Sequence, residues 1–173
     1  MGRDTAKYIM LIVSMILVQV LVCNHIMLFS LAVPIIFFYP VLRLPMSMSV
    51  KAVMTIAFFI GLIMDIFSDT PGVNTISCTV LAVVRRPVFH SFTGNDEALA
   101  GVSPCIATLG FWTLFKYLLV CTPIYCLMAI GLEYFTFVSL QRTLSIIGAS
   151  SLLSFILLLG VDSLTGGKGK SQR

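Results

Sequence analysis

Six long apolar runs, separated by short polar connections, make up most of this chain. A helix that crosses the hydrocarbon core of a bilayer needs about 20 mainly apolar residues. The pattern therefore predicts an all-α fold, a polytopic membrane helical bundle of six transmembrane helices in a single integral membrane domain over residues 1–173. The predicted spans are residues 8–23, 28–44, 50–67, 72–84, 112–135 and 144–164.

Two of these runs depart from an ideal span. Residues 28–44 contain Pro34 and Pro40, so we expect a short, kinked helix that ends at a basic connection. The apolar part of the fourth run, residues 73–84, would reach only about 18 Å as a helix. It can cross the bilayer only if it is extended at its ends or shielded by neighbouring helices.

The fifth run, residues 104–135, is longer than one span, so we expect its first part to lie at the membrane interface. Trp112, Lys116 and Tyr117 are typical of a headgroup belt, in which aromatic rings are half wet and a lysine reaches the surface. This places the fully embedded helix in the later part of the run.

Composition excludes a water-soluble domain. The chain has 11 Lys and Arg, 7 Asp and Glu, and 58% hydrophobic residues, against roughly 25% charged residues in soluble domains. The net charge of +4 therefore bears on topology, and we expect membrane lipids and no nucleic acid as partners.

The basic residues predict the orientation of the bundle. If both termini are cytoplasmic, all bases except Arg142 fall on the inner side, as the positive-inside rule requires. The inner side then includes a loop over residues 85–103 and a basic tail over residues 166–173, whereas Asp65, Asp69 and Glu133 lie outside. We expect a multi-pass protein with a cytoplasmic N-terminus and C-terminus.

Asp65 and Asp69 are the main candidates for chemistry, because they are four residues apart and would share a face of a continuing helix. Paired carboxylates at a membrane edge could relay protons, bind a cation or form an aspartyl protease dyad. The alternative is a polar turn that continues through Gly72, or a protein contact. The chain has no GxGD sequence, and we favour the turn or contact.

Other catalytic or metal-binding patterns are absent from the sequence. It contains no P-loop, GxSxG, HExxH or dinucleotide fingerprint. The five cysteines form no CxxC pair, and His25 and His90 are far apart. We expect no enzyme activity, no cofactor, no metal site and no disulfide framework.

Small residues near the fourth run favour close packing of helices. Gly61 and Gly72 would let backbones approach, and Asn74, Ser77 and Thr79 can bond across to a neighbour. This could line a small-molecule pocket, but helix packing is the better interpretation.

Arg85 and Arg86 follow the fourth run directly. They are expected to anchor topology and contact anionic lipid headgroups. Docking of a cytoplasmic partner is the alternative.

Three segments together resemble a known family. They are the Pro34-containing run that ends in Arg43-Leu44-Pro45, the stretch from Gly61 through Asp65, Asp69 and Gly72 to Asn74, and Val84-Arg85-Arg86-Pro87. In these segments, in size and in number of spans, the chain resembles the rod shape-determining protein MreD family of bacterial cell-wall elongation.

The resemblance implies a non-catalytic scaffold of the bacterial inner membrane, with a fold like the substrate-binding subunits of energy-coupling-factor vitamin transporters. It implies binding to MreC and, through the elongation machinery, association with MreB, RodA and the transpeptidase partner of RodA. The fold-defining or contact positions that it implies are Gly61, Asp65, Asp69, Gly72, Asn74 and Arg85, with Arg86 beside them.

Two other classes of protein remain as alternatives. A substrate-binding subunit of a vitamin-type transporter would need an enclosed polar cavity lined by Asp65, Asp69, Asn74 and Thr75. An intramembrane enzyme would need two ionisable residues within hydrogen-bond distance below the bilayer surface.

Overall fold

The computed structural model describes residues 2–21, 34–94, 103–133 and 140–166, and within these ranges all regular structure is helical. The helices are α1 Gly2–Leu21, α2 Tyr39–Arg43, α3 Val50–Ser68, α4 Val73–Thr93, α5 Ile106–Leu109, α6 Phe111–Glu133 and α7 Leu140–Gly166.

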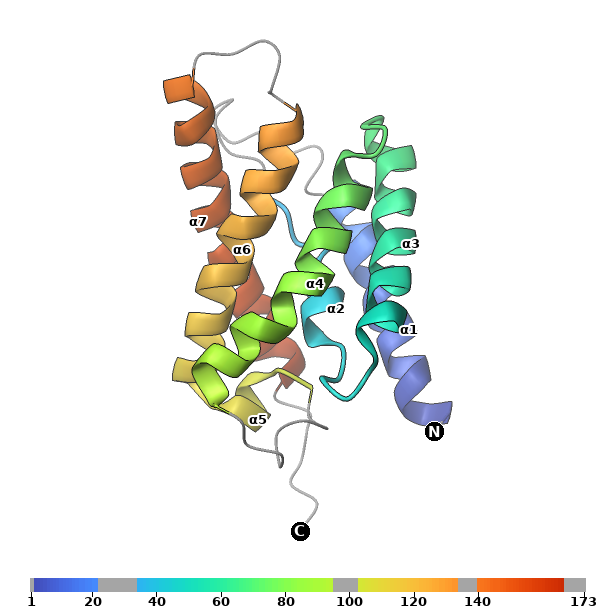
Figure 1. Cartoon of the computed structure of the whole chain (residues 1–173). Helices are drawn as coiled ribbons and strands as arrows, with labels where there is room; N and C mark the ends of the chain where they lie inside the picture. Colours follow the sequence, from blue (N-terminus) through green and yellow to red (C-terminus); the bar gives the residue numbers. More distant parts are fainter. Residues whose placement is uncertain (1, 22–33, 95–102, 134–139, 167–173) are drawn as a thin grey trace.

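The long helices lie side by side in one bundle (Figure 1). Helix α3 packs along α4, α4 along α6, and α6 along α7, while the short helix α2 lies among them. The beginning of α1 and the end of α7 lie toward the same end of the molecule, which we name the lower end. The α3–α4 turn lies at the opposite, upper end.

Three helices are long and apolar enough to cross a membrane: Val50–Ser68, Phe111–Glu133 and Thr143–Ser163. A shorter apolar helix covers Tyr8–Leu21. Many large side chains on the outside are apolar, among them Met10 and Ile66. Such a surface is typical of a protein that contacts lipid or a partner. The all-helical structure of the described residues confirms the predicted fold class, and the three long apolar helices suggest membrane association.

The second predicted span, residues 28–44, is wrong as a continuous helix. Residues 28–33 lie outside the described ranges, residues 34–38 are non-helical, and only α2 is helical in this region. Pro40 stands in the first turn of α2, where a missing N–H costs nothing. Leu44, which precedes Pro45, is already extended at ψ 143°.

The non-helical segment is buried, so its backbone needs partners from elsewhere in the bundle. Gln19 of α1 meets this need twice: its Nε2 donates to the Pro34 carbonyl (3.0 Å), and its Oε1 accepts from the Ile36 N–H (2.8 Å). The Ile35 N–H donates to Ser154 Oγ of α7 (2.8 Å). Helix α1 and helix α7 thus both bind the backbone of the non-helical segment 34–38.

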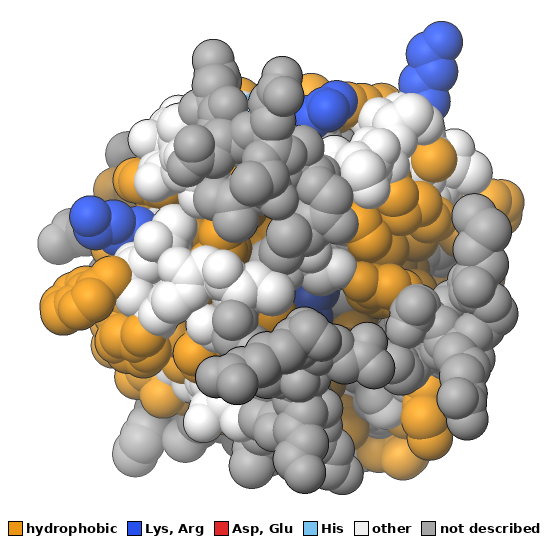
Figure 2. Space-filling model, turned by 90° about the horizontal axis from the view of Figure 1, so that it is seen from below, with side chains coloured by type: hydrophobic (Ala, Val, Ile, Leu, Met, Phe, Trp, Pro, Cys, Tyr) orange, Lys and Arg blue, Asp and Glu red, His pale blue; other side chains and the backbone are white. Residues whose placement is uncertain are grey.

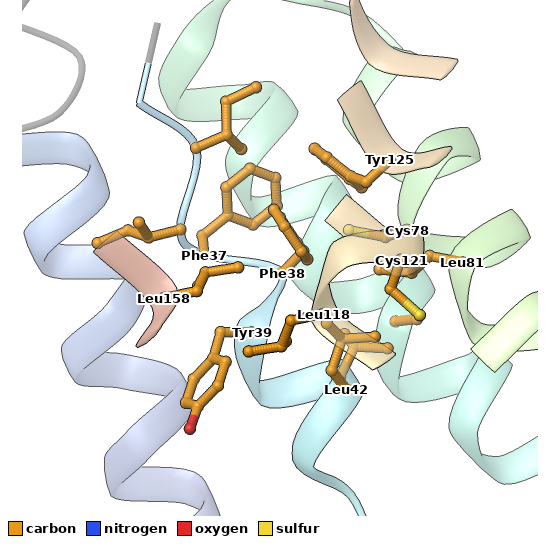
Figure 3. Packing of buried hydrophobic residues seen from close by; sticks show 14 of the residues in the cluster. Phe37, Phe38, Tyr39, Leu42, Cys78, Leu81, Leu118, Cys121, Tyr125 and Leu158 are labelled. Atoms are coloured by element: carbon orange, nitrogen blue, oxygen red, sulfur yellow. The ribbon is translucent and has the colours of Figure 1, made fainter. Parts of the chain in front are cut away.

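This segment also carries the centre of the hydrophobic core (Figure 3). The Phe38 ring stacks on Tyr125 of α6 with centroids 4.3 Å apart, and Phe37 meets the same ring edge-on at 5.8 Å. Leu158 of α7 and Cys78 of α4 are buried in the same cluster. Phe37 and Phe38 therefore pack the non-helical segment against α6 in the core that α4 and α7 also line.

The fourth helix is longer than predicted. It was expected to end at Val84, with a loop over 85–103, but α4 continues through Pro87 to Thr93 and Gly94 closes it by donating to the His90 carbonyl. Its 21 residues reach about 31 Å, enough for a bilayer core. Residues 95–102 of the predicted loop lie outside the described ranges.

We predict that Gln19→Leu lowers the free energy of unfolding by about 3 kcal/mol, because a buried carbonyl and a buried N–H lose their partners. The measurement is the thermal unfolding midpoint in detergent micelles, followed by far-ultraviolet circular dichroism. Gln141→Leu, at an exposed position of α7, is the matched control and is expected to change the midpoint little. Equal midpoints for the two variants would contradict the role of Gln19.

Candidate functional site

The carboxylate of Asp65 lies where α3 ends and α4 begins, and only 6% of the residue is exposed. Its Oδ1 accepts from the Asn74 N–H (2.8 Å) and Thr70 Oγ1 (3.2 Å). Its Oδ2 accepts from the Thr75 N–H (2.9 Å) and Thr75 Oγ1 (2.5 Å). A negative group at this point satisfies free N–H groups of the first turn and matches the positive end of the helix dipole. Asp65 of α3 therefore caps α4.

The turn between the two helices explains why this cap comes from a neighbouring helix. The N-cap position of α4 is Gly72, which has no side chain to offer and adopts φ 84°, a left-handed conformation that favours glycine. Asp69 ends α3 in the left-handed region at φ 54°, and its N–H donates to the Asp65 carbonyl. Asp69 itself is exposed.

The structure therefore separates the two aspartates that the spacing had paired. Helix α3 ends at Ser68, so Asp69 does not continue the helix face of Asp65. The hydrogen bonds of the Asp65 carboxylate come from the turn and the beginning of α4. This geometry agrees with the turn that we favoured.

Gly61 lets α3 and α4 touch at the level of this cap. A Cβ atom at position 61 would lie 2.5 Å from the Thr75 Cα and 2.7 Å from the Asn74 carbonyl oxygen. Such distances do not occur for real side chains, so any larger residue would push α4 away from Asp65. Gly61 and Asp65, one turn apart, therefore act together on the same part of α4.

Asn74 extends the cap to a third helix. Its Nδ2 donates to Thr70 Oγ1 (2.9 Å), and its Oδ1 accepts from the hydroxyl of Tyr125 on α6 (2.8 Å). The predicted bond across to a neighbour is thus present for Asn74. Ser77 and Thr79, which were expected to do the same, donate instead to carbonyls four residues earlier in α4.

Arg85, in the lower half of α4, bonds to the end of α2. The residue is 2% exposed, and its guanidinium donates to three carbonyls at the end of α2: from Nη1 to Val41 (2.8 Å) and Leu44 (2.9 Å), and from Nη2 to Pro45 (3.2 Å). A cation fits there because the last carbonyls of a helix have no intrahelical partners. Arg86, the next residue, is exposed.

This use of Arg85 explains why α4 does not end where the sequence suggested. The sequence analysis placed Arg85 and Arg86 at the start of the inner loop, as topology anchors at the lipid headgroups. Arg85 remains inside because the carbonyls of a broken helix solvate it.

Asp162 of α7 is a third buried charge, and the sequence analysis missed it. It has no exposed surface, its Oδ1 accepts from the Tyr39 hydroxyl, and its Oδ2 accepts from the Ile106 N–H (3.0 Å). It therefore joins α7 to the beginnings of α2 and α5. The sequence did contain a signal for such a site, namely a single polar side chain inside an apolar run. Asp162 is such a residue in the sixth run, and Gln19 is such a residue in the first.

Tyr117 also differs from its prediction. It was expected in a headgroup belt with Trp112 and Lys116, which are exposed. Instead it is buried, and its ring meets Phe89 of α4 edge-on at 6.0 Å. Consecutive helix residues point about 100° apart, so Lys116 can face outward while its neighbour enters the core.

The described residues offer little for metal or thiol chemistry. No group of three or more His, Cys, Asp or Glu side chains among them could hold a metal ion. The cysteines in the described ranges, Cys78, Cys105, Cys121 and Cys126, are free and buried.

The chain was compared with models of protein families, with curated proteins and with solved structures, and none of the three comparisons found a match.

We predict that Asp65→Ala lowers the free energy of unfolding by about 3 kcal/mol, because it removes the cap of α4 and leaves buried N–H groups unpaired. Asp69→Gly is the matched control: it removes a carboxylate from the same turn but keeps the left-handed backbone. Its thermal midpoint in detergent is expected to equal or exceed that of the wild type. Equal losses in both variants would indicate that the two carboxylates work as a pair.

We predict a similar contrast between the two arginines. Arg85→Met leaves three carbonyls without a donor and is expected to cost about 3 kcal/mol, whereas Arg86→Met is expected to stay within about 0.5 kcal/mol of the wild type. Both variants remove one positive charge, so the comparison isolates the buried contacts. Equal losses of the unfolding midpoint in the two variants would show that stability depends on the positive charge and not on the hydrogen bonds of Arg85 to α2.

Proposed function

We propose that the protein is a non-catalytic scaffold of the bacterial inner membrane that serves cell-wall elongation by binding MreC and positioning peptidoglycan synthesis. One observation carries this proposal. The buried charged residues Asp65, Arg85 and Asp162 all bond to groups of the chain itself, at the ends of its own helices. Charges used in this way fix the shape of a body, and a fixed shape is what a scaffold needs.

The resemblance to the MreD family gives the proposal its biological setting. The segments on which it rests contain Gly61, Asp65, Gly72, Asn74 and Arg85. In the fold, these residues hold α3 and α4 together and join α4 to the end of α2. Such positions would be retained in a family that depends on one arrangement of helices, even without a reaction to catalyse.

The proposed topology has six passes with both termini in the cytoplasm. Helices α1, α3, α4, α6 and α7 supply five passes, and residues 34–43 supply the sixth as an unwound strand followed by α2. The lower end, where α1 begins and α7 ends, carries the exposed bases Lys51, Arg86 and Lys116. This agrees with the positive-inside rule if the lower end is cytoplasmic.

The transporter subunit is the alternative, and one observation favours it. Unwound segments within a bundle are typical of substrate sites in transporters, and residues 34–38 form such a segment. Against this, Gln19 and Ser154 already occupy several of its backbone groups. Asp69 is exposed while Asp65 and Thr75 bond to each other, so these residues do not line one polar cavity.

We predict that the tagged protein, extracted from its native membrane in detergent, recovers MreC, and that a photoreactive amino acid crosslinks to MreC from one side of the bundle only. Suitable exposed positions are Phe59 and Ile66 on α3 and Leu152 on α7. A scaffold presents one binding face, so crosslinks are expected at α3 or at α7 but not at both.

The controls separate binding from folding. Asp69→Gly is expected to recover MreC as the wild type does, and size-exclusion chromatography identifies any variant that has lost its fold. Recovery of an ATPase module, or of a tightly bound small molecule, in place of MreC would overturn the scaffold and support the transporter subunit.

A further inference from the structure

The outer face of α6 changes from aromatic to basic to apolar along its length. Trp112 is 71% exposed, Lys116 follows one turn later, and Leu119, Pro123 and Leu127 are exposed above it. Spacings of three and four residues place all of these positions on one side of the helix. The face begins at the lower end of the bundle and runs toward the upper end (Figure 1).

The aromatic part of this face is a compact group at the beginning of α6. The rings of Phe111, Trp112 and Phe115 lie with their centroids 6.0 Å apart, and Phe115 also meets Phe155 of α7 at 5.0 Å. Tryptophan at such a position favours the boundary between headgroups and hydrocarbon. The face therefore enters the bilayer at Trp112.

Charge at the lower end has one sign among the described side chains. Its exposed charged residues in the described part of the chain are Lys51, Arg86 and Lys116, and the view from below shows Lys and Arg in blue (Figure 2). Asp69 and Glu133, which are exposed, lie at the upper end, and Asp162 is buried. The exposed charges that the structure describes at the end of the bundle where Lys116 lies are thus basic.

We propose that Lys116 and Trp112 form a binding site for an anionic phospholipid, with the phosphate at the lysine ammonium and an acyl chain along Leu119, Pro123 and Leu127. From Lys116 to Leu127 the helix rises about 16 Å, close to half of the 30 Å hydrocarbon core. A ligand that joins an anionic group to an apolar chain of this length is a phospholipid of one leaflet. An acidic soluble protein would satisfy the lysine but not the apolar face above it.

This site rests on the proposed membrane location but not on the proposed partner, so it is tested in purified protein. Trp112 is the only tryptophan in the sequence, and its fluorescence reports on lipids beside it. The full chain is reconstituted in phosphatidylcholine bilayers with an equal mole fraction of phosphatidylglycerol. Bromine atoms, which quench tryptophan, are placed on the acyl chains of one lipid or of the other.

In the wild type we expect brominated phosphatidylglycerol to quench more strongly, with a preference of roughly fivefold, the effect of one surface base on an anionic lipid. In Lys116→Gln the preference is expected to fall to roughly one, because the anion loses its partner. Arg142→Gln, near the beginning of α7, and Lys51→Gln, on α3, each remove one base elsewhere and are expected to keep the preference.

Three results would overturn this site. They are equal quenching by both lipids in the wild type, a preference that survives Lys116→Gln, and a preference lost as fully in Lys51→Gln, which would indicate general surface charge. Loss of the preference on adding millimolar inorganic phosphate would reassign the lysine to a free anion. Absence of quenching by either lipid would contradict the membrane location itself, whereas MreC binding is tested separately.

Discussion

The rest of the structure depends on one constraint, which is that every break in a helix must be repaired inside an apolar body. An unpaired polar backbone group that is buried away from water costs free energy. The chain breaks its helical path at residues 34–38, between α2 and α3, and between α3 and α4. At each break, side chains supply the missing bonds: Gln19 and Ser154 at residues 34–38, Arg85 at the end of α2, and Asp65 at the beginning of α4.

Helix α4 is the element on which these repairs converge. Its beginning is capped by Asp65 of α3 and lies against Gly61 of the same helix, and Arg85 in its lower half bonds to the end of α2. Tyr125 of α6 completes the network by donating to Asn74 and stacking on Phe38. Because α3, α2 and α6 all hold α4, a change at one contact is expected to be felt at the others, and the contributions of Asp65 and Arg85 need not add.

The sequence predicts the elements whose cause is local and misses those whose cause is remote. The long apolar runs of α3, α6 and α7 are sufficient to indicate helices, and Gly72 after Asp69 indicates the turn. The unwound strand at residues 34–38 could not be predicted, because its partners Gln19 and Ser154 are distant in sequence. Asp65 was found because it stands in a group of turn residues, whereas Asp162 stands alone in an apolar run and was missed.

The need to pair buried polar groups distinguishes two sets of side chains, those that bond within the fold and those exposed on its surface. Asp65, Arg85 and Asp162 face inward and are occupied, so substitutions there alter function only through the fold. Lys116 and Trp112 face outward and support no described helix end, so substitutions there leave the fold intact and alter only what binds. If the protein is the scaffold proposed above, its selectivity for a partner comes from its outer side chains, because the buried charges are already bonded within the chain. A search for partner contacts should therefore begin on the outer surface.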